Sequence, residues 1–304
     1  GGAWKPMTKQ IRKGYGTVIL ASLAYGVMPV VSKLLLLSGM NSESVVFYRF
    51  FLTCLFSALI LAAFRGFRAV TLPQAVLLAL FGILGFGFTM QFLTISYQYI
   101  PIGLATVLHF AYPLFVTLIM LAVYGEKPAP ARLWGCAAAL AGICLMVDLK
   151  GGFSPGGVIY ALLSAVTYSA FVVSNKKACY GSLSPMLCLF AFSLSASLFF
   201  GLSCTLTGTL QVPCSLYQWG CLMAVSLLCT VFAFCTLMTG VRILGAAKAS
   251  VINMLEPATG VVFGVILFKE KLSLKIMIGC ACILVSTLIT VLARDSRKDG
   301  GKKI

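Results

Sequence analysis

Residues 105–140, ATVLHFAYPLFVTLIMLAVYGEKPAPARLWGCAAAL, align without a gap on residues 249–284, ASVINMLEPATGVVFGVILFKEKLSLKIMIGCACIL, at an offset of 144 positions. Self-similarity at a fixed offset is the signature of a duplicated unit. The chain is therefore predicted to contain two related halves. The nine identical pairs among the 36 positions are Ala105/Ala249, Val107/Val251, Pro113/Pro257, Glu126/Glu270, Lys127/Lys271, Gly135/Gly279, Cys136/Cys280, Ala137/Ala281 and Leu140/Leu284.

The composition predicts that both halves lie in a membrane. Of the 304 residues, 60% are hydrophobic and 10% are charged, and the mean hydropathy is +1.03. A soluble domain contains about 45–50% apolar and about 25% charged residues. The net charge of +16 does not indicate nucleic-acid binding, because Lys and Arg lie between apolar runs and at the chain ends rather than in a basic patch.

Ten apolar runs approach the length of about 20 residues that a helix needs to cross a membrane. We therefore predict an all-α membrane protein with ten transmembrane helices, arranged as two five-helix repeats. The expected spans are 17–37, 45–64, 74–97, 103–124, 132–148, 155–177, 186–207, 216–241, 246–268 and 273–293. The expected divisions are a cytoplasmic N-terminal segment (1–13, with 1–6 read as a cloning remnant), a first repeat (14–149), a second repeat (154–293) and a basic cytoplasmic tail (294–304).

The positions of Lys and Arg set the expected orientation, because cytoplasmic loops are enriched in both. A cytoplasmic N-terminus places 17 of the 23 Lys and Arg residues on the inner side and 6 on the outer side. Both termini are therefore predicted to be cytoplasmic, in a multi-pass protein of the plasma (inner) membrane. Five spans is an odd number, so the second half is expected to be inverted relative to the first. Inverted repeats are typical of transporters.

Motifs recur at matching places in the two halves: Ala24-Tyr25-Gly26…Ser32-Lys33 and Thr167-Tyr168-Ser169…Asn175-Lys176, Pro113…Glu126 and Pro257…Glu270, together with Leu255-Glu256-Pro257. These motifs resemble those of the EamA family of the drug/metabolite transporter superfamily. The family commonly has tryptophan where this chain has Tyr25 and Tyr168. The resemblance covers nearly the whole chain and implies a bundle with a central cavity lined by spans 1, 3, 4, 6, 8 and 9.

Two clusters of polar residues occupy equivalent faces of spans 4 and 9. The i, i+3, i+4 spacing places each cluster on one helical face. Charged side chains at mid-membrane cost about 2.5–3.5 kcal/mol, so such residues tend to face a cavity. Each proline removes a backbone donor and is expected to break its helix. The clusters are His109, Tyr112 and Pro113 in span 4, and Asn253, Glu256 and Pro257 in span 9.

Glu256 and His109 are the two candidates for coupling transport to protons. Glu256 is the only carboxylate well inside a predicted span. It could bind a proton or a substrate ammonium group, or it could pair with a neighbouring polar group and stabilise the disturbed helix. His109 is the only histidine. It could relay protons near neutral pH, or it could hydrogen-bond a tyrosine as a structural group.

Three tyrosines are expected to line the cavity, where their rings could contact a charged amine. Helix packing is the alternative for each of them. Gln91 in span 3 is a further candidate for the cavity. The full set of predicted substrate-binding residues is Tyr25, Gln91, His109, Tyr112, Tyr168, Asn253 and Glu256.

Charged residues near the ends of spans have two interpretations. Lys33 and Lys176 lie at opposite ends of their spans, where they could gate the cavity or bind a substrate carboxylate, or could extend to the interface. Arg49 and Glu43 are expected at the outer interface. Close helix packing is expected at Gly82, Gly85 and Gly87, which lack the strand and helix start of a phosphate loop.

Metal and cofactor chemistry is not expected. The 12 cysteines form no CxxC pair and there is a single histidine, a poor basis for a metal site. Cys204 and Cys214 flank a short predicted outer loop, and whether they pair is left open.

The predicted function is secondary active transport by alternating access. Small polar metabolites, amino acids first, are the expected substrates, with export and proton coupling as the favoured mode. The alternative is transport of organic cations, quaternary amines or drugs. An enzyme using His109 as a base is disfavoured, because no catalytic spacing accompanies this histidine. A channel is also disfavoured, and saturable counterflow would argue against it. The expected partners are a small-molecule substrate and the bilayer, and an oligomer is not required.

Overall fold

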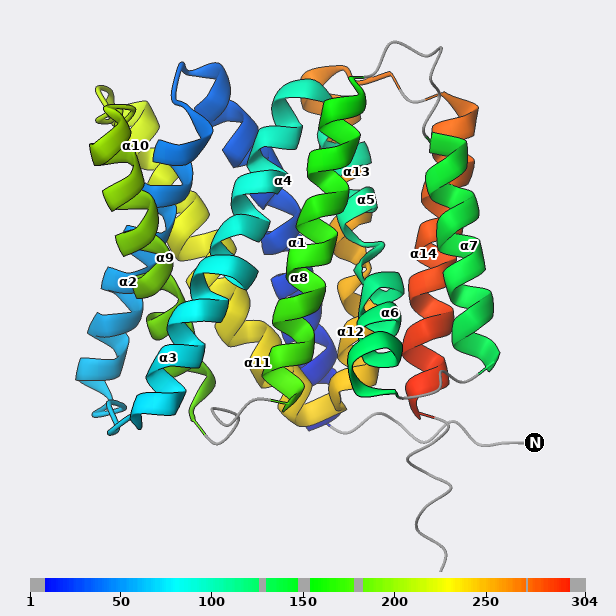
Figure 1. The fold of residues 1–304 in the computed structure, drawn as a ribbon, viewed down its shortest axis with the longest axis horizontal. Coiled ribbons are helices and arrows are strands. Elements are labelled where there is room, and N and C mark those ends of the chain that lie inside the picture. The colour runs from blue at the N-terminus through cyan, green and yellow to red at the C-terminus, as the bar shows by residue number, and fades with distance from the viewer. Residues whose placement is uncertain (1–8, 126–129, 147–153, 178–182, 272, 296–304) are drawn as a thin grey trace, which may run out of the picture.

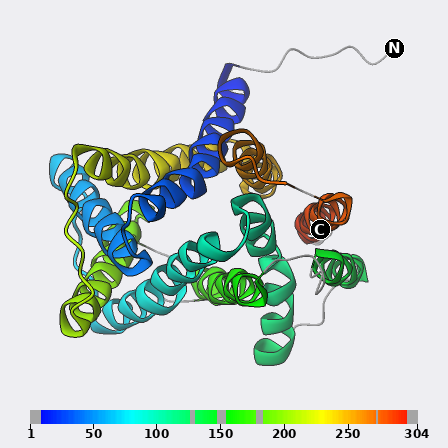
Figure 2. The same cartoon turned by 90° about the horizontal axis from the view of Figure 1, so that it is seen from above.

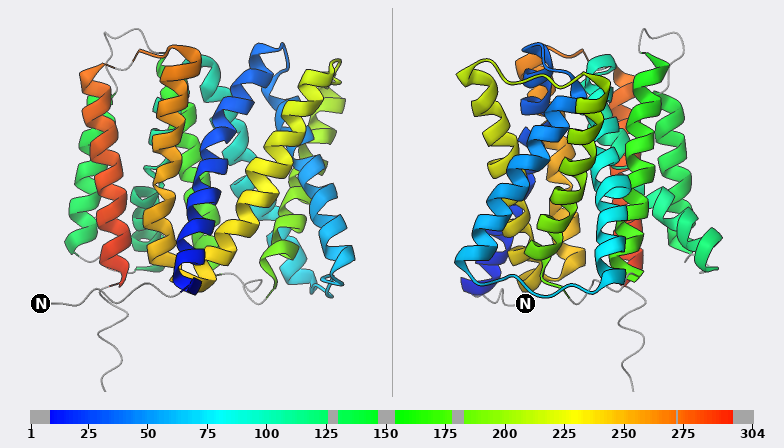
Figure 3. Two further views of the ribbon diagram at one scale, coloured as in Figure 1. Left: turned by 180° about the vertical axis from the view of Figure 1, so that it is seen from behind. Right: turned by 60° about the vertical axis from the view of Figure 1, so that its left-hand side comes forward.

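The computed structural model describes residues 9–125, 130–146, 154–177, 183–271 and 273–295 (Figure 1). These residues form helices with short connections, and no strand occurs among them. Figures 1 and 3 show that the start of the first helix and the end of the last lie at the same end of the bundle. We call this the N-terminal end of the bundle.

The elements of the first part of the chain recur in the same order in the second part. Helix α5 and helix α12 begin 144 residues apart (246 − 102) and also end 144 residues apart (253 − 109). The first set is α1 (Lys9–Leu37), α2 (Ser42–Ala63), α3 (Leu72–Phe81), the π-helix η1 (Gly82–Gly87), α4 (Phe88–Tyr99), α5 (Ile102–His109), α6 (Tyr112–Tyr124) and α7 (Pro130–Met146). The second set is α8 (Pro155–Lys177), α9 (Pro185–Thr207), α10 (Leu216–Met223), the π-helix η3 (Ala224–Phe232), α11 (Ala233–Leu244), α12 (Ala246–Asn253), α13 (Leu255–Phe268) and α14 (Leu274–Asp295).

Eight helical stretches among the described residues are long and apolar enough to cross a membrane, so the protein is a multi-pass membrane protein. The two other expected spans, 132–148 and 273–293, coincide with α7 and α14. Their qualifying apolar stretches are shorter, Leu133–Gly142 and Met277–Ile289. The eight are Gln10–Leu37, Ser42–Ala63, Leu72–Tyr99, Ile102–Tyr124, Pro155–Ser174, Pro185–Thr207, Leu216–Leu244 and Val251–Phe268.

Local sequence explains where several helices begin and end. The Oδ1 atom of Asn41 accepts the N–H of Ser44 at 2.8 Å and caps α2. The hydroxyl of Ser184 accepts the N–H of Leu187 at 3.2 Å and caps α9. Such side chains satisfy backbone donors that the first turn leaves unpaired. Gly208 ends α9 with a φ of +68°, a conformation that glycine adopts readily.

The packing of the helices exchanges partners between the two sets. Helix α1 packs against α11 and α13, whereas α8 packs against α4 and α6. Helix α2 packs against α9, and α7 packs against α14. Figure 2 shows the α7–α14 pair at one edge of the bundle. The first helix of each set therefore packs mainly against helices of the other set.

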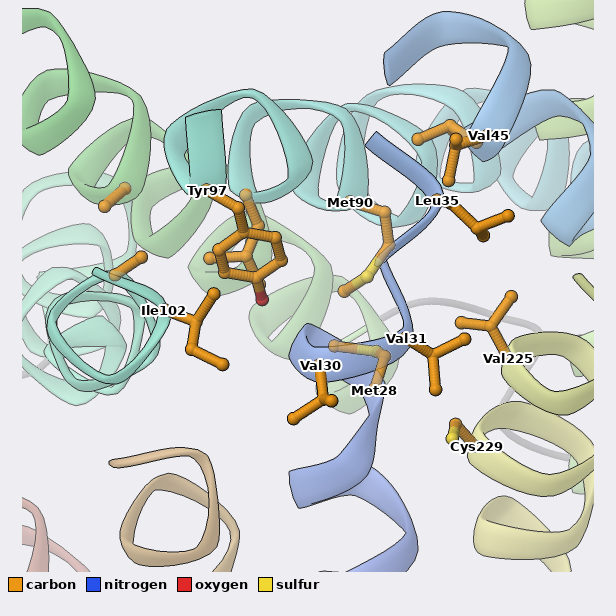
Figure 4. Close-up of a cluster of buried hydrophobic side chains, with 14 of the residues drawn as sticks. Met28, Val30, Val31, Leu35, Val45, Met90, Tyr97, Ile102, Val225 and Cys229 are labelled. Atoms are coloured by element: carbon orange, nitrogen blue, oxygen red, sulfur yellow. The ribbon is translucent and has the colours of Figure 1, made fainter. Parts of the chain in front are cut away.

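A buried apolar cluster joins α1, α4 and η3 beside the central region (Figure 4). Met28 and Val31 of α1 lie between Met90 of α4 and the residues Val225 and Cys229 of η3. Lipid tails are as apolar as these side chains, so close van der Waals packing, rather than escape from water, stabilises such contacts. This cluster fixes α1 in the middle of the bundle.

The three glycines of η1 permit close helix approaches, as the sequence predicted. A Cβ atom on Gly85 would lie 2.7 Å from Cβ of Phe171 in α8. A Cβ atom on Gly82 would lie 2.9 Å from Cα of Phe192 in α9, and one on Gly87 would lie 2.9 Å from the ring of Phe200. The absence of side chains at these positions lets α8 and α9 approach η1 directly.

Substitution of Gly85 by alanine is expected to destabilise the protein by about 1–3 kcal/mol, because the new methyl group overpacks the contact with Phe171. The measurement is the apparent melting temperature in detergent. The matched control is Gly220→Ala in α10, where a Cβ atom would meet nothing within 4 Å. Equal melting temperatures for the two variants would contradict the close packing of η1 on α8.

Candidate functional site

A cavity of about 460 Å³ lies at the centre of the bundle. This volume falls within the range of about 300–1,000 Å³ that is usual for small-molecule sites. Its wall includes Arg49 of α2 and several residues of α9, in addition to the spans that the family resemblance implied. The polar and titratable residues on the wall include Tyr25, Arg49, Thr106, His109, Tyr112, Tyr168, Thr230, Asn253 and Glu256.

Both predicted helix breaks lie at this cavity. Helix α5 ends at His109 and α6 begins at Tyr112, whereas α12 ends at Asn253 and α13 begins at Leu255. Pro113 and Pro257 follow these breaks, where each lacks the N–H group that would continue the preceding helix. Interrupted helices inside a membrane protein are tolerated where they line a cavity. Four polar side chains at the breaks, His109, Tyr112, Asn253 and Glu256, line the cavity.

The carboxylate of Glu256 is positioned by its neighbours on α12 and α1. The Nδ2 group of Asn253 donates a hydrogen bond to Oε2 of Glu256 at 3.1 Å. The hydroxyl of Ser22 lies 3.1 Å from Oδ1 of Asn253, and it shares its one proton between this oxygen and the carbonyl of Val18, which is 2.8 Å away. Ser22 did not stand out in the sequence, because a serine in an apolar helix commonly bonds its own backbone, as Ser22 also does to Val18.

An aromatic wall faces Glu256 from α5, α6 and α8. The rings of Tyr112 and Tyr168 are 4.9 Å apart at 88°, and the ring of His109 lies 5.1 Å from that of Tyr168. The Nδ1 atom of His109 is 3.0 Å from the hydroxyl of Ser164, which itself donates to the carbonyl of Ala161 at 2.6 Å. Since this hydroxyl has one proton, Nδ1 of His109 is the donor to Ser164.

Six of the seven residues predicted to bind substrate lie on the cavity wall, and Gln91 does not. The amide of Gln91 instead donates to the hydroxyl of Ser42 at 3.2 Å, in the buried contact between α4 and α2. Its side chain therefore joins two helices away from the cavity. The six on the wall are Tyr25, His109, Tyr112, Tyr168, Asn253 and Glu256.

The expectation that Arg49 lies at the membrane interface was wrong. Its side chain is only 4% exposed and lines the cavity. Nη1 donates to the sulfur of Met90 at 3.2 Å, and Nη2 donates to the hydroxyl of Thr230 at 3.2 Å. Two turns into α2, Arg49 is covered by α4 and η3, and this packing was not visible in the sequence of α2 itself. Glu43, in the first turn of α2, bonds the hydroxyl of Thr209 at 2.9 Å.

An ion pair joins three segments at the end of the bundle opposite to the N-terminal end. Nζ of Lys33 in α1 is 2.9 Å from Oε1 of Glu270, which follows α13. The same oxygen accepts the N–H of Ile102, the first residue of α5, at 2.9 Å. Lys33 also lies over the ring of Phe268, 4.8 Å from its centre. Lys33 was expected either to gate the cavity or bind a substrate carboxylate, or to extend to the interface; in the structure its ammonium group instead contacts the carboxylate of Glu270. The side chain of Lys176 lies outside the described residues.

The cysteines of the described residues are free thiols, and these include Cys204 and Cys214. The Sγ atom of Cys214 contacts the carbonyl of Val212 at 3.1 Å, whereas Cys204 is buried beside Glu43. In the part of the chain that the structure describes, no three His, Cys, Asp or Glu residues are grouped as metal ligands would be.

Comparison with known proteins places this bundle among transporters. The model of the EamA-like transporter family matches the chain twice, over residues 12–148 and 155–292. An uncharacterized transporter of Clostridium kluyveri is 22% identical, with 95% of this chain and 96% of that protein covered. The uncharacterized transporter YetK of Bacillus subtilis is 23% identical, with 76% of this chain and 72% of that protein covered.

The fold is also similar to that of a protein solved by crystallography. The TM-score is 0.63 at 20% sequence identity, and the match covers 94% of this chain and 99% of that chain. The double family match and the apolar helices agree with the motifs in the two halves. The chain therefore belongs to the EamA-like transporter family of membrane proteins.

Proposed function

We propose that this chain is a secondary transporter that moves small polar metabolites, amino acids first, by alternating access. The observation that carries the proposal is the central cavity on which both helix breaks and Glu256 lie. Transporters of inverted-repeat architecture bind substrates near the membrane midplane, between interrupted helices of the two halves. A cavity of this volume can surround a molecule of metabolite size.

We further propose that the chain crosses the membrane ten times, as two inverted five-helix repeats at 14–149 and 154–293. The recurrence of element bounds at an offset of 144 supports this arrangement. The exchanged packing of α1 and α8 supports it as well, because a twofold relation converts one set of contacts into the other. Helices α7 and α14 would then be the fifth span of each repeat.

Two observations support a conformation that faces the N-terminal end of the bundle, the conformation in which an exporter with a cytoplasmic N-terminus would bind its substrate. The cavity wall extends to Leu183, Pro185 and Met238, near the start of α9 and in α11, toward the N-terminal end of the bundle. At the opposite end of the bundle, the ion pair between Lys33 and Glu270 joins α1 to a residue that follows α13. If the N-terminus is cytoplasmic, as the distribution of Lys and Arg predicts, substrate enters this conformation from the cytoplasm. The plasma membrane is the proposed location.

Glu256 and the surrounding tyrosines also support a second candidate, the transport of organic cations. A carboxylate among aromatic rings is suited to an ammonium group. The two candidates differ in whether the substrate's own carboxylate matters. Amino acid esters should fail to exchange in the first case and should compete in the second.

The test is counterflow in proteoliposomes that contain the full chain. Vesicles are preloaded with unlabelled amino acids or quaternary amines, and the uptake of the labelled compounds is followed at pH 6 and pH 8. We expect saturable accumulation of amino acids above protein-free vesicles, with a dependence on pH if Glu256 or His109 couples transport to protons. The absence of exchange for every compound would contradict the proposal, and exchange of amines alone would favour the cation transporter.

A further inference from the structure

The cavity wall carries one basic and one acidic side chain that do not pair with each other. Arg49 and Glu256 both line it, yet the ion pair among the described residues that lies within 4.0 Å is that of Lys33 and Glu270. The two groups are near enough to interact electrostatically. Buried charges are normally paired, because an unpaired charge loses its hydration without compensation. Each of these two groups therefore lacks a close partner of opposite charge.

The hydrogen bonds of Arg49 leave its guanidinium incompletely satisfied. Its partners are the sulfur of Met90 and the hydroxyl of Thr230, which are neutral, and the sulfur is a weak acceptor. The Nε atom is buried and has no partner among the described residues. A guanidinium offers five donors in a planar fork that matches a carboxylate. Arg49 is thus a buried cation on the cavity wall, and both of its hydrogen-bond partners in the described residues are neutral.

Glu256, in the first turn of α13, offers the complementary charge on the same cavity wall. The structure shows one hydrogen bond to its carboxylate, from Asn253 to Oε2. Three neutral groups, the rings of Tyr25, Tyr112 and Tyr168, share the cavity wall with it. An ammonium group placed among them would gain both the carboxylate and ring faces.

The remaining wall contains an apolar cluster formed by three phenylalanines. Phe86 of η1 stacks on Phe171 of α8 with ring centres 5.6 Å apart. Phe192 of α9 lies 5.0 Å from Phe171 and 6.1 Å from Phe86. All three rings line the cavity. Apolar groups of a ligand gain free energy by burial against such a surface.

We infer that the ligand of this cavity is a zwitterion with a bulky apolar side chain, whose carboxylate binds Arg49 and whose ammonium group binds Glu256. The side chain would lie against Phe86, Phe171 and Phe192. This inference rests on the proposed transport of small metabolites and names their class. Arg49 becomes the specificity-determining residue, since it separates zwitterions from simple amines.

Binding to the full chain in detergent tests the inference without requiring transport. Stabilisation by a ligand raises the melting temperature according to its dissociation constant. The reference probe is phenylalanine. Its methyl ester lacks the carboxylate charge, its N-acetyl derivative lacks the ammonium charge, and glycine lacks the side chain. We expect phenylalanine to bind at least about tenfold more tightly than each of the others, as expected for a lost charge-assisted hydrogen bond.

Variants of Arg49 assign the carboxylate preference to this residue. Arg49→Gln should weaken the binding of phenylalanine about tenfold or more and leave the ester unaffected, so that the preference for acid over ester disappears. Arg49→Lys should keep part of the preference, since a lysine retains the charge but not the fork. The control is Arg242→Gln, which removes an exposed cation in the last turn of α11 that does not line the cavity.

Two results would overturn the inference. One is equal affinity of the wild-type protein for phenylalanine and its ester, a comparison that needs no variant. The other is a full preference for the acid in Arg49→Gln. Counterflow of the same compounds separates this test from that of the proposed function. Selective binding without any exchange would contradict transport and leave the ligand class in place, whereas exchange that ignores the carboxylate would contradict the ligand class and leave transport in place.

Discussion

Replacement of Glu256 by glutamine is expected to reduce the transport efficiency, kcat/KM, by about 10–100-fold. Glutamine keeps the volume of the side chain, and its oxygen can still accept the amide of Asn253, so the helix break at α12 and α13 should persist. The substitution removes the negative charge that an ammonium group would contact. Hydrogen bonds to charged groups contribute about 1.5–3 kcal/mol, and a factor of ten corresponds to about 1.4 kcal/mol.

The measurement is the initial rate of counterflow over a range of substrate concentrations at pH 6 and pH 8. Glu43→Gln is the matched control, because this carboxylate lies in the first turn of α2 and not on the cavity wall. A Glu256→Gln protein that is fully active with unchanged pH dependence would exclude Glu256 from both substrate binding and coupling. If Glu256→Gln melts at the wild-type temperature, its loss of activity is not caused by loss of folding.

Removal of the Glu270 side chain is expected to open the end of the bundle that Lys33 closes. Glu270→Ala deletes the ion pair to Lys33 and the acceptor for the N–H of Ile102. The side chains are 19% exposed for Lys33 and 6% exposed for Glu270, so water screens this pair less than it screens a surface pair. Loss of a charge-assisted contact of about 1.5–3 kcal/mol should increase the population open at this end by about 10–100-fold.

Amide hydrogen exchange of the peptide that contains Ile102 reports this opening directly. Exchange should accelerate in Glu270→Ala and in Lys33→Gln, and it should remain at the wild-type rate in Lys271→Gln. Lys271 is an exposed lysine of the same connection and provides the matched control. The double variant Lys33→Glu/Glu270→Lys, which exchanges the two charges, should recover only part of the protection from exchange. Its Glu270→Lys side chain cannot accept the N–H of Ile102. Unchanged exchange in Glu270→Ala would show that the ion pair does not hold this end closed.

The closing contact is also incomplete in a way that suits a reversible gate. The Oε2 atom of Glu270 is buried and has no partner among the described residues. An unsatisfied buried acceptor costs about 1–3 kcal/mol, which offsets part of the stabilisation from the ion pair. The contact between Lys33 and Glu270 is therefore held by a modest free energy, as the proposed alternating access would require of a contact that opens and closes.

Local chemistry explains why the helix breaks could be predicted from the sequence. Pro113 and Pro257 lack backbone donors, and that property acts on residues one turn away, whatever the rest of the fold does. Their polar neighbours on the same helical face, His109 and Glu256, followed from spacing alone. All four lie where the two breaks meet the cavity or directly beside it.

Contacts between distant segments explain what the sequence did not reveal. Gln91 was expected in the cavity, but its amide faces Ser42, 49 residues earlier in the chain. Arg49 was expected at the interface, but it meets Thr230, 181 residues later. In both cases the side chain's position in its own helix was known, and the neighbouring helix that covers that face was not.

The sequence by itself determined the helical membrane class, the duplicated motifs and the positions of the two breaks, since these depend on composition, offset and the backbone chemistry of proline. Only the tertiary structure decided that Arg49 and Glu256 line one cavity and that Lys33 pairs with Glu270. The physical reason is that hydropathy and periodicity describe one helix at a time. The pairing of charges depends on which helices pack together, and the sequence of a single helix does not specify its neighbours.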